Sequence, residues 1–394
     1  MDARPIVHGG RPCILLRDPL QLTDKTLILP QALGPALALC DGTRDLSGIS
    51  AALLVRFAVR VSPGTLEQLL QALDEMLLLD NERFAQAQVQ ALVAYHGAPF
   101  RPPTGAGQSY PADPAELRQL LQGYLDAADD VQPDPLPGRG LISPHIDYAR
   151  GGSVYARVWK RAAQAVQAAD LAIILGTDHY SESNLLTLTR QSYATPFGVL
   201  PTPPDLVEAL AQAMGAEAAF AGELHHRGEH SIELAAVWLH YVRQERPCAL
   251  LPILCGSFER FVRGQENPER DPQLNALVDV LRQTVAERRT VVIAAADLAH
   301  VGPAFGGAPL GWMERAQLQA ADDELLAHIG SGDAPGFFAA LRRDGDRRNV
   351  CGLPPIYLAL RILQPVSGES IAYQRCPADQ QGTSFVSVCG VVWH

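Results

Sequence analysis

The sequence predicts an α/β protein whose larger domain has three layers, with a mixed or mainly parallel sheet between helices, and whose smaller N-terminal domain contains short strands and helices. Three nearly pure apolar runs support the sheet, and amphipathic stretches separate them: LAIILG at 171–176, CALLPILCG at 248–256 and TVVIAAADLAH at 290–300. Such runs are typical of strands buried on both faces. The length of 394 residues and the apolar fraction of 47% are typical of a folded protein with two domains.

Residues 1–90 show the pattern of the smaller domain. Two short apolar segments, CILLRD at 13–18 and KTLILP at 25–30, are typical of strands. The turn sequence DGT at 41–43 is followed by an amphipathic helix, and Ser62 marks the start of a second helix with leucines at helical spacing.

This order of strands and helices resembles the small winged-helix modules of the PqqD-like type. Modules of that family bind peptides or partner proteins, so the resemblance implies a docking role for residues 1–90. The alternative is a helical appendage that only packs against the second domain and stabilises it. DNA binding is disfavoured because the segment has few clustered basic residues.

A boundary near residue 100 divides the chain. Residues 91–104 fall in a stretch rich in Gly and Pro, so we expect an irregular linker there. The domain at 105–394 begins with a helix that Asp113 caps, with Pro114 in its first turn. A proline-rich segment then leads into the first strand of the sheet, which ends just before His145.

Histidines follow the ends of several predicted strands. His145 and His179 each follow a strand, His300 follows another together with Asp297, and His230 precedes a helix. In α/β folds these strand ends meet at one edge of the sheet, where such folds place their chemistry. Neutral imidazoles combined with a thiolate or carboxylate are the ligands that a divalent transition metal needs. One histidine alone is more often a loop or capping residue, so both interpretations of His145 stay open on this pattern.

Spacing within the chain does not decide between them. His226 and His230 have HxxxH spacing, but Gly228 between them disfavours a shared helix face. Most of the seven cysteines sit in apolar surroundings and form no CxxC pair, which excludes a disulfide framework. Cys351 differs, because it lies in RRNVCGLPP at a polar-to-apolar junction.

The net charge and the absence of several sequence motifs disfavour some classes of function. The formal net charge of −11 disfavours nucleic-acid binding. The chain has no GxGxxG motif after a strand, no GxxxxGK[ST] motif and no GxSxG motif, which disfavours nucleotide cofactors and α/β-hydrolase chemistry. It also lacks a membrane span and the apolar core of a signal peptide, so we expect a cytoplasmic protein without membrane contact.

The order of the polar motifs resembles the Memo family, whose bacterial members are called AmmeMemoRadiSam system protein B. The motifs that carry the resemblance stand in order along about 290 residues: PHIDY at 144–148, GTDH at 176–179, EHSIE at 229–233, DLAH at 297–300 and VCGLPPI at 350–356. The sequence departs from the family at Asp147, where a small residue is common, and at Tyr180, where a second histidine is common. A carboxylate at Asp147 could join the coordination or change substrate choice.

The resemblance implies a fold akin to that of the class III extradiol dioxygenases, which hold a non-haem iron. Carried over residue by residue, it implies that His145, His179 and Cys351 bind the metal. It implies that His230 and His300 support the ligands or act as general acids and bases, with Asp297 orienting His300 or a bound water.

Two histidines and a thiolate suit Fe(II) or Cu, with Zn as a further option. We expect a metal-dependent, oxygenase-like redox enzyme that acts on a small molecule or a modified peptide. The alternative is a non-enzymatic metal-binding or scaffold protein. Genes of the family are associated with a radical-SAM protein and an AMMECR-type protein, and the resemblance implies these as partners. On these grounds His145 is interpreted as a ligand.

Overall fold

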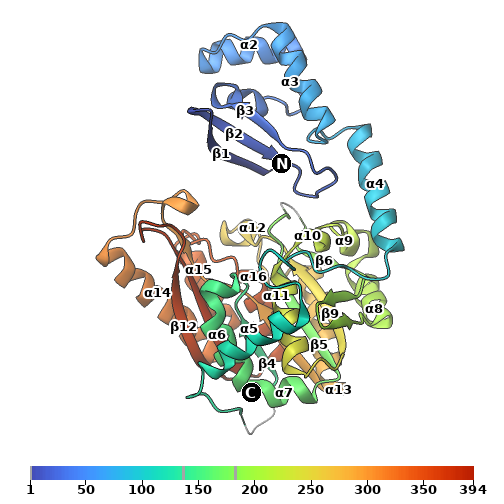
Figure 1. The fold of residues 1–394 in the computed structure, drawn as a ribbon, viewed down its shortest axis with the longest axis vertical. Coiled ribbons are helices and arrows are strands. Elements are labelled where there is room, and N and C mark those ends of the chain that lie inside the picture. The colour runs from blue at the N-terminus through green and yellow to red at the C-terminus, as the bar shows by residue number, and fades with distance from the viewer. Residues whose placement is uncertain (1, 135–137, 182–183) are drawn as a thin grey trace. The chain divides into compact units, whose positions relative to one another are not determined.

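The computed structural model describes residues 2–134, 138–181 and 184–394, and it divides the chain into two compact units. The first unit is Met1–Gly97 and the second is Ala98–His394. Figure 1 shows the elements of both units, and each unit is described by itself.

The first unit combines a small antiparallel sheet with four helices. Its strands lie in the order β1-β2-β3 and its helices follow in the chain: β1 (Asp2–His8), β2 (Arg11–Arg17), β3 (Leu27–Pro30), the 3₁₀ helix η1 (Gln31–Leu33), α1 (Gly34–Leu37), α2 (Leu46–Phe57), α3 (Pro63–Glu75) and α4 (Glu82–Gly97). The side chain of Asp45 accepts the backbone N–H of Gly48 and caps α2, and the side chain of Ser62 accepts the backbone N–H of Thr65 and caps α3. Leu16, Leu53 and Leu69 lie in the core between sheet and helices. The resemblance to PqqD-like modules stays a prediction.

The stretch 91–104, expected as an irregular linker, is helical as far as Gly97 and contains no helix or strand from 98 to 104. Helix α4 continues through Gly97, and the following segment packs into the second unit. The buried guanidinium of Arg101 forms an ion pair with the buried carboxylate of Glu233 and donates to the backbone carbonyl of Glu229. A buried cation requires such partners, and they fix a segment that its Gly and Pro content alone marks as irregular.

A mixed, mainly parallel sheet forms the middle of the second unit, which confirms the predicted fold class. The strand order is β11-β13-β4-β10-β5-β9-β6, and β12 pairs with β13. The central four strands are parallel, whereas β6, β11, β12 and β13 form antiparallel pairs. Their bounds are β4 (Gly140–Ser143), β5 (Leu171–Thr177), β6 (Leu186–Leu188), β9 (Ala249–Cys255), β10 (Thr290–Ala295), β11 (His300–Val301), β12 (Gly368–Pro377) and β13 (Phe385–Trp393).

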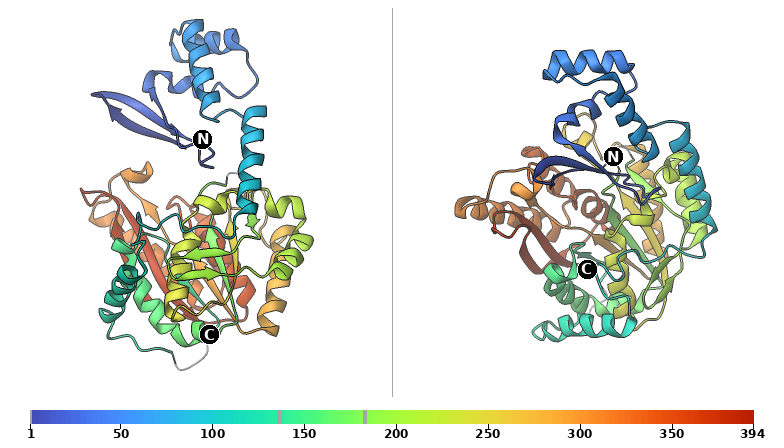
Figure 2. Two further views of the ribbon diagram at one scale, coloured as in Figure 1. Left: turned by 45° about the vertical axis from the view of Figure 1, so that its right-hand side comes forward. Right: turned by 45° about the horizontal axis from the view of Figure 1, so that its top comes forward.

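Helices cover both faces of this sheet and complete the three layers (Figures 1 and 2). One face packs against α5 (Pro114–Asp126), α6 (Tyr148–Arg161), α7 (Ala163–Ala168) and α11 (Ser231–Val242). The other packs against α8 (Pro204–Met214), α13 (Pro272–Glu287), α14 (Trp312–Gly330), α15 (Ala334–Arg343) and α16 (Leu353–Leu363). Alternate residues of β10 take opposite sides, with Ile293 in one apolar cluster and Val292 in the other.

Smaller elements connect the layers: β7 (Tyr193–Thr195), β8 (Gly198–Leu200), α9 (Ala216–Phe220), α10 (His225–Gly228), α12 (Glu259–Val262) and the 3₁₀ helix η2 (Pro303–Phe305). Among the described residues, no helix is both long and apolar enough to cross a membrane.

Candidate metal centre

Two loops that leave parallel strands and the start of a helix bring three histidines together. His145 follows β4, His179 follows β5, and His230 is the residue before α11. Their ring centroids are 5.0 to 5.6 Å apart. One nitrogen from each ring lies within 4.8 Å of the other two, so the three imidazoles are close enough to share one ion. The structure therefore brings these three of the histidines together, as expected from their positions in the sequence.

Cys351 joins this group from the turn before α16. Its Sγ atom lies 3.3 Å from Nε2 of His145 and 3.8 Å from the backbone oxygen of Asp297. Burial would raise the pKa of the thiol, but the charges of His145 and His300 and hydrogen bonds from His145 and His179 lower that pKa well below its usual value. These contacts favour the thiolate form of Cys351, which is the form that binds metals.

His145 is held by contacts on both sides. Its Nδ1 lies 2.9 Å from the backbone oxygen of Ala295, and its backbone N–H donates to Oδ1 of Asp297 at 2.9 Å. The other oxygen of Asp297 lies 3.8 Å from Nε2 of His145. Burial alone would lower the pKa of His145, but Asp297 and Cys351 raise it to about 9. Asp297 thus positions His145, whereas the sequence interpretation assigned it to His300 or a bound water.

Glu229 was not singled out as a site residue, although it begins the EHSIE motif. Its fully buried carboxylate lies 3.1 Å from Nδ1 of His179 and 3.1 Å from Nδ1 of His230, and it accepts the backbone N–H of His179 at 3.0 Å. Burial would raise the pKa of Glu229, but His179 and His230 hold it well below its usual range. In turn Glu229 and Cys351 raise the pKa of His179 well above its usual value, against the effect of burial. One carboxylate therefore orients two of the three histidines.

His300 lies next to the centre without joining it. Its ring packs against Phe305 with centroids 5.1 Å apart, and its Nδ1 lies 3.2 Å from the backbone oxygen of Leu298. It lines a cavity of about 380 Å³ together with Arg348 and Asn349. An electrostatic interaction with His300 contributes to the lowered pKa of Cys351, so the influence of His300 on the centre is electrostatic.

Three residues that the sequence raised as open questions have other contacts. His226 is fully buried, with Nδ1 2.5 Å from the Tyr193 hydroxyl and Nε2 3.1 Å from the Thr187 carbonyl oxygen, so it does not pair with His230. The carboxylate of Asp147 accepts the backbone N–H of Arg150 and caps α6, and the hydroxyl of Tyr180 donates to the carbonyl oxygen of Gly228 at 3.4 Å.

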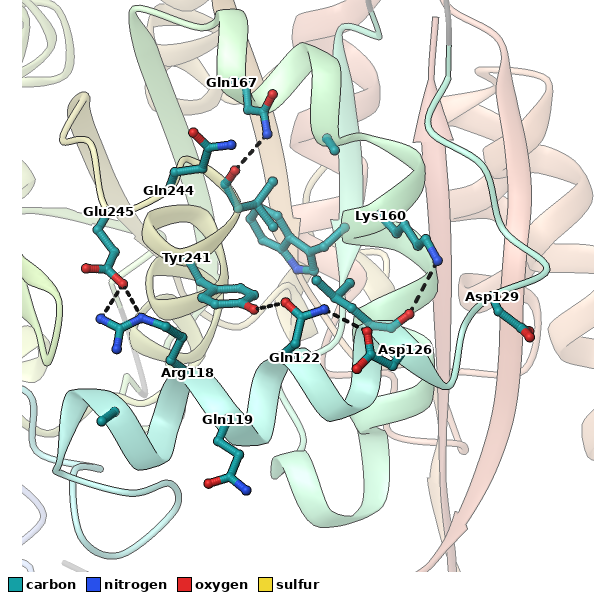
Figure 3. A pocket seen from close by; sticks show the side chains of 15 residues that line it. Arg118, Gln119, Gln122, Asp126, Asp129, Lys160, Gln167, Tyr241, Gln244 and Glu245 are labelled. Carbon is teal, nitrogen blue, oxygen red and sulfur yellow. Dashed lines mark hydrogen bonds and ion pairs between the residues drawn. The ribbon is translucent and has the colours of Figure 1, made fainter.

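Two further cavities differ in what they offer a ligand. A cavity of about 330 Å³ is lined by His179 and Cys351 and so opens onto the histidine–cysteine group. Another, of about 1090 Å³, lies between α5, α6, α7 and α11 (Figure 3). Its side chains bond mainly to one another, as in the ion pair of Arg118 with Glu245 and the hydrogen bond from Tyr241 to Gln122. The smaller cavity is therefore the one that gives a ligand access to the histidine–cysteine group.

The donor set fits a divalent transition metal. The Nδ1 atoms of His145 and His179 face a carbonyl oxygen and a carboxylate, which favours protons on Nδ1 and leaves Nε2 free as an electron-pair donor. Together with the thiolate of Cys351, these nitrogens form a set of two imidazoles and one sulfur that suits iron, copper or zinc. The imidazole of His230 lies within reach of the same ion.

Comparison with known proteins gives consistent matches over most of the chain. Residues 101–392 match the family model described as Memo-like protein. A MEMO1 family protein of Aquifex aeolicus is 25% identical over 386 residues, covering 96% of each chain. One of Methanopyrus kandleri is 29% identical over 287 residues, covering 69% of this chain and 91% of its own. One of Thermus thermophilus is 26% identical over 342 residues, covering 84% of this chain and 94% of its own.

Proposed function

The chain belongs to the Memo family, and from this premise we propose that its second unit binds iron or copper through His145, His179 and Cys351 and uses it in an oxygenase-like redox reaction. The substrate class in this proposal is a small molecule or a modified peptide. One observation carries the proposal: three imidazoles lie within 4.8 Å of one another, with a thiolate 3.3 Å from one of them.

Charge balance supports the metal. Without an ion, the thiolate of Cys351 is balanced by protons on His145 and His179, whose pKa values are raised for this reason among others. A divalent cation supplies the same positive charge from the same place, and binding it releases those protons. The buried carboxylates of Asp297 and Glu229 add negative charge behind the ligands and so favour a cation further.

The protein groups around the ligands have separable tasks. A bound iron or copper ion would supply the one-electron chemistry that side chains lack. His230 is held through Nδ1 by Glu229 while 48% of its side chain is exposed, so its Nε2 side can exchange a proton with a substrate. His300 and Asp297 support the centre, His300 through its charge and Asp297 through the backbone of His145.

Metal content is the first test of this proposal. We expect purified protein reconstituted with Fe(II), Cu or Zn to retain about one ion per chain, and we expect His145→Ala and Cys351→Ser to lose most of it. His328→Ala and Cys40→Ser are matched controls, because these residues lie outside the group of three histidines and the thiol. Equal metal content in all five proteins would remove the proposal.

Catalysis is tested separately from binding. The alternative is a non-enzymatic metal-binding or scaffold protein, which needs the ligands but not His230. We expect metal-loaded protein to consume oxygen with catechols or a cell extract, and His230→Gln to slow this without loss of metal. Absence of oxygen consumption under all conditions would favour the alternative.

For the first unit we propose partner binding by strand addition, with a radical-SAM or AMMECR-type protein as the partner. Strands β1 and β3 are the outer strands of its sheet, and Val7 and Ile28 on them are exposed. The match to the Methanopyrus protein is about as long as the second unit and covers most of that relative, which supports a second unit that folds alone. A chain that begins at Ala98 should keep its metal and lose partner binding. Aggregation or loss of metal would assign the first unit a structural role instead.

A further inference from the structure

The cavity beside His179 and Cys351 has an unbalanced charge. Its volume is about 330 Å³, at the lower end of the range for small-molecule sites. Three carboxylates line it, those of Asp178, Glu259 and Asp346, together with the thiol of Cys351. The imidazole of His179 is the one basic group that faces them, since none of the described residues that line the cavity is Lys or Arg. A cavity with this lining repels phosphates and carboxylates and attracts cations.

Two of these carboxylates are already engaged. Asp178 accepts the backbone N–H groups of Tyr180 and Ser181 and lies 2.8 Å from Nδ1 of His225. Glu259 forms an ion pair with Arg263. The charge of each of these two carboxylates is therefore already partly balanced by protein groups, which leaves less of it for a ligand.

Asp346 is different, because among the described residues only one of its two carboxylate oxygens has a partner. Oδ1 accepts the backbone N–H of Val350 at 3.0 Å, and within the described parts of the chain no group bonds to Oδ2. The neighbouring guanidinium of Arg348 pairs with Asp322 and Asp344 instead. The carboxylate of Asp346 therefore retains a hydrogen-bonding site for a ligand.

The backbone of this loop holds Asp346 in an uncommon conformation. Its φ angle is 49°, in the left-handed region that Asp and Asn adopt more readily than most other residues. Its N–H donates to the carbonyl oxygen of Leu341 and its carbonyl oxygen accepts the N–H of Asn349, both at 2.9 Å. These bonds fix the position of the side chain relative to the turn that carries Cys351.

The rest of the cavity offers an apolar surface. Phe258, Val262, Leu353 and Pro354 line it. Phe258 and Leu353 are buried in the core of the unit, so this surface is rigid. A ligand that fills the cavity can bury an apolar body there while a polar group remains at Asp346.

We propose that this cavity binds a small molecule with a cationic amine and an apolar body, with the ammonium group at Oδ2 of Asp346 and the body against Phe258 and Leu353. The proposal rests on the proposed function in one respect, since it names the substrate class of the same centre. The position of the cavity brings such a ligand next to His179 and Cys351.

Calorimetric titration of the full chain with three probes of similar shape tests the charge preference. Phenethylamine carries a cation, phenethyl alcohol is neutral and hydrocinnamate is an anion. We expect the amine to bind about tenfold or more tightly than the alcohol, as for a hydrogen bond to a charged group, and the anion to bind most weakly. Added salt should narrow the difference.

Asp346→Asn assigns the preference to one residue. Asn tolerates the left-handed φ and its amide oxygen can still accept the N–H of Val350, so the loop should keep its shape. We expect this variant to bind the amine and the alcohol about equally, with alcohol binding unchanged. Asp279→Asn on α13 is the control, because it makes the same change in charge at an exposed site outside the cavity.

Three results would overturn the proposal: no binding of any probe, equal binding of amine and alcohol to the unmodified chain, or an amine preference that persists in Asp346→Asn. Metal content measured on the same samples keeps the proposed function separate. A preference that depends on Asp346 in protein without metal would leave the amine site standing and contradict the metal centre. Metal bound at His145 without a preference for the amine would support the metal centre and contradict the amine site.

Discussion

Replacing Glu229 with Gln probes how much the proposed metal centre depends on one buried carboxylate. In the structure its oxygens receive the backbone N–H groups of His179 and Ser231 and face the Nδ1 atoms of His179 and His230. Glu229→Gln keeps the size of the side chain, but it removes the charge and replaces one acceptor with a donor. That NH₂ group then faces N–H groups, which it cannot satisfy.

The expected loss follows from the role of Glu229 behind two histidines. Residues that orient metal ligands typically change metal affinity by about 10- to 100-fold when altered. This corresponds to about 1.4–2.7 kcal/mol of binding free energy. Because Glu229 contacts two rings, we expect Glu229→Gln to fall at the upper end of this range.

A competition titration against a chelator of known affinity measures the effect, with far-UV circular dichroism to verify the fold. Glu223→Gln is the matched control, since Glu223 is also buried but accepts a hydrogen bond from Thr189 and does not contact the three histidines. We expect the control to bind metal as the unmodified chain does. An unchanged metal affinity in Glu229→Gln would refute the assignment of Glu229.

Three further predictions concern stability and reactivity. Arg101→Leu leaves the carboxylate of Glu233 buried without its cation, so it should lower the free energy of unfolding, measured with denaturant, by about 3–5 kcal/mol. Arg118→Leu removes an exposed cation and should lower it by less than about 1 kcal/mol. Similar losses of stability in the two variants would contradict this. Burial lowers the pKa of His226 to about 3. Between about pH 6.5 and 3, His226 is therefore protonated in the unfolded state but neutral in the folded state. The free energy of unfolding should therefore fall as the pH drops from about 6.5 toward 3, and His226 should account for a loss of about 2 kcal/mol at pH 5. His226→Asn should lose less stability over the same pH range than the unmodified chain. An equal loss of stability in both proteins would refute this. After metal removal, iodoacetamide at pH 6 should modify Cys351 before the buried cysteines, which peptide mass spectrometry can measure. Bound metal should slow the modification of Cys351. Modification at the same rate with and without metal would contradict the role of Cys351 as a ligand.

The sheet was predictable because its strands carry a signal that needs no tertiary information. LAIILG is apolar at nearly every position, and only a strand covered on both faces explains such a run next to amphipathic helices. The helix that begins after Asp113 was predictable for a similar reason, since the cap and Pro114 act within one turn. The direction of β12 and β13 was not predictable, because it depends on which strand each one pairs with.

The convergence of the strand-end histidines was predictable from the sequence, whereas the groups that hold their rings were not. Histidines at strand ends meet because the fold brings those ends to one edge, so His145 and His179 could be placed together from the sequence. The partner of each imidazole depends on side-chain geometry across 50 to 152 residues of chain, as for Glu229 with His179 and Asp297 with His145. Among the 43 acidic residues of the chain, the sequence pointed to Asp297 but assigned it to His300 or a bound water, and no pattern marked Glu229 as a support.

X-ray absorption spectroscopy of the metal-loaded full chain tests the central claim most directly, because it reports the atoms that touch the ion. With iron or copper bound, we predict scattering from one sulfur and from imidazole nitrogens, and we predict that the sulfur contribution disappears in Cys351→Ser. A spectrum with nitrogen and oxygen alone in the unmodified chain would contradict a centre built from His145, His179 and Cys351.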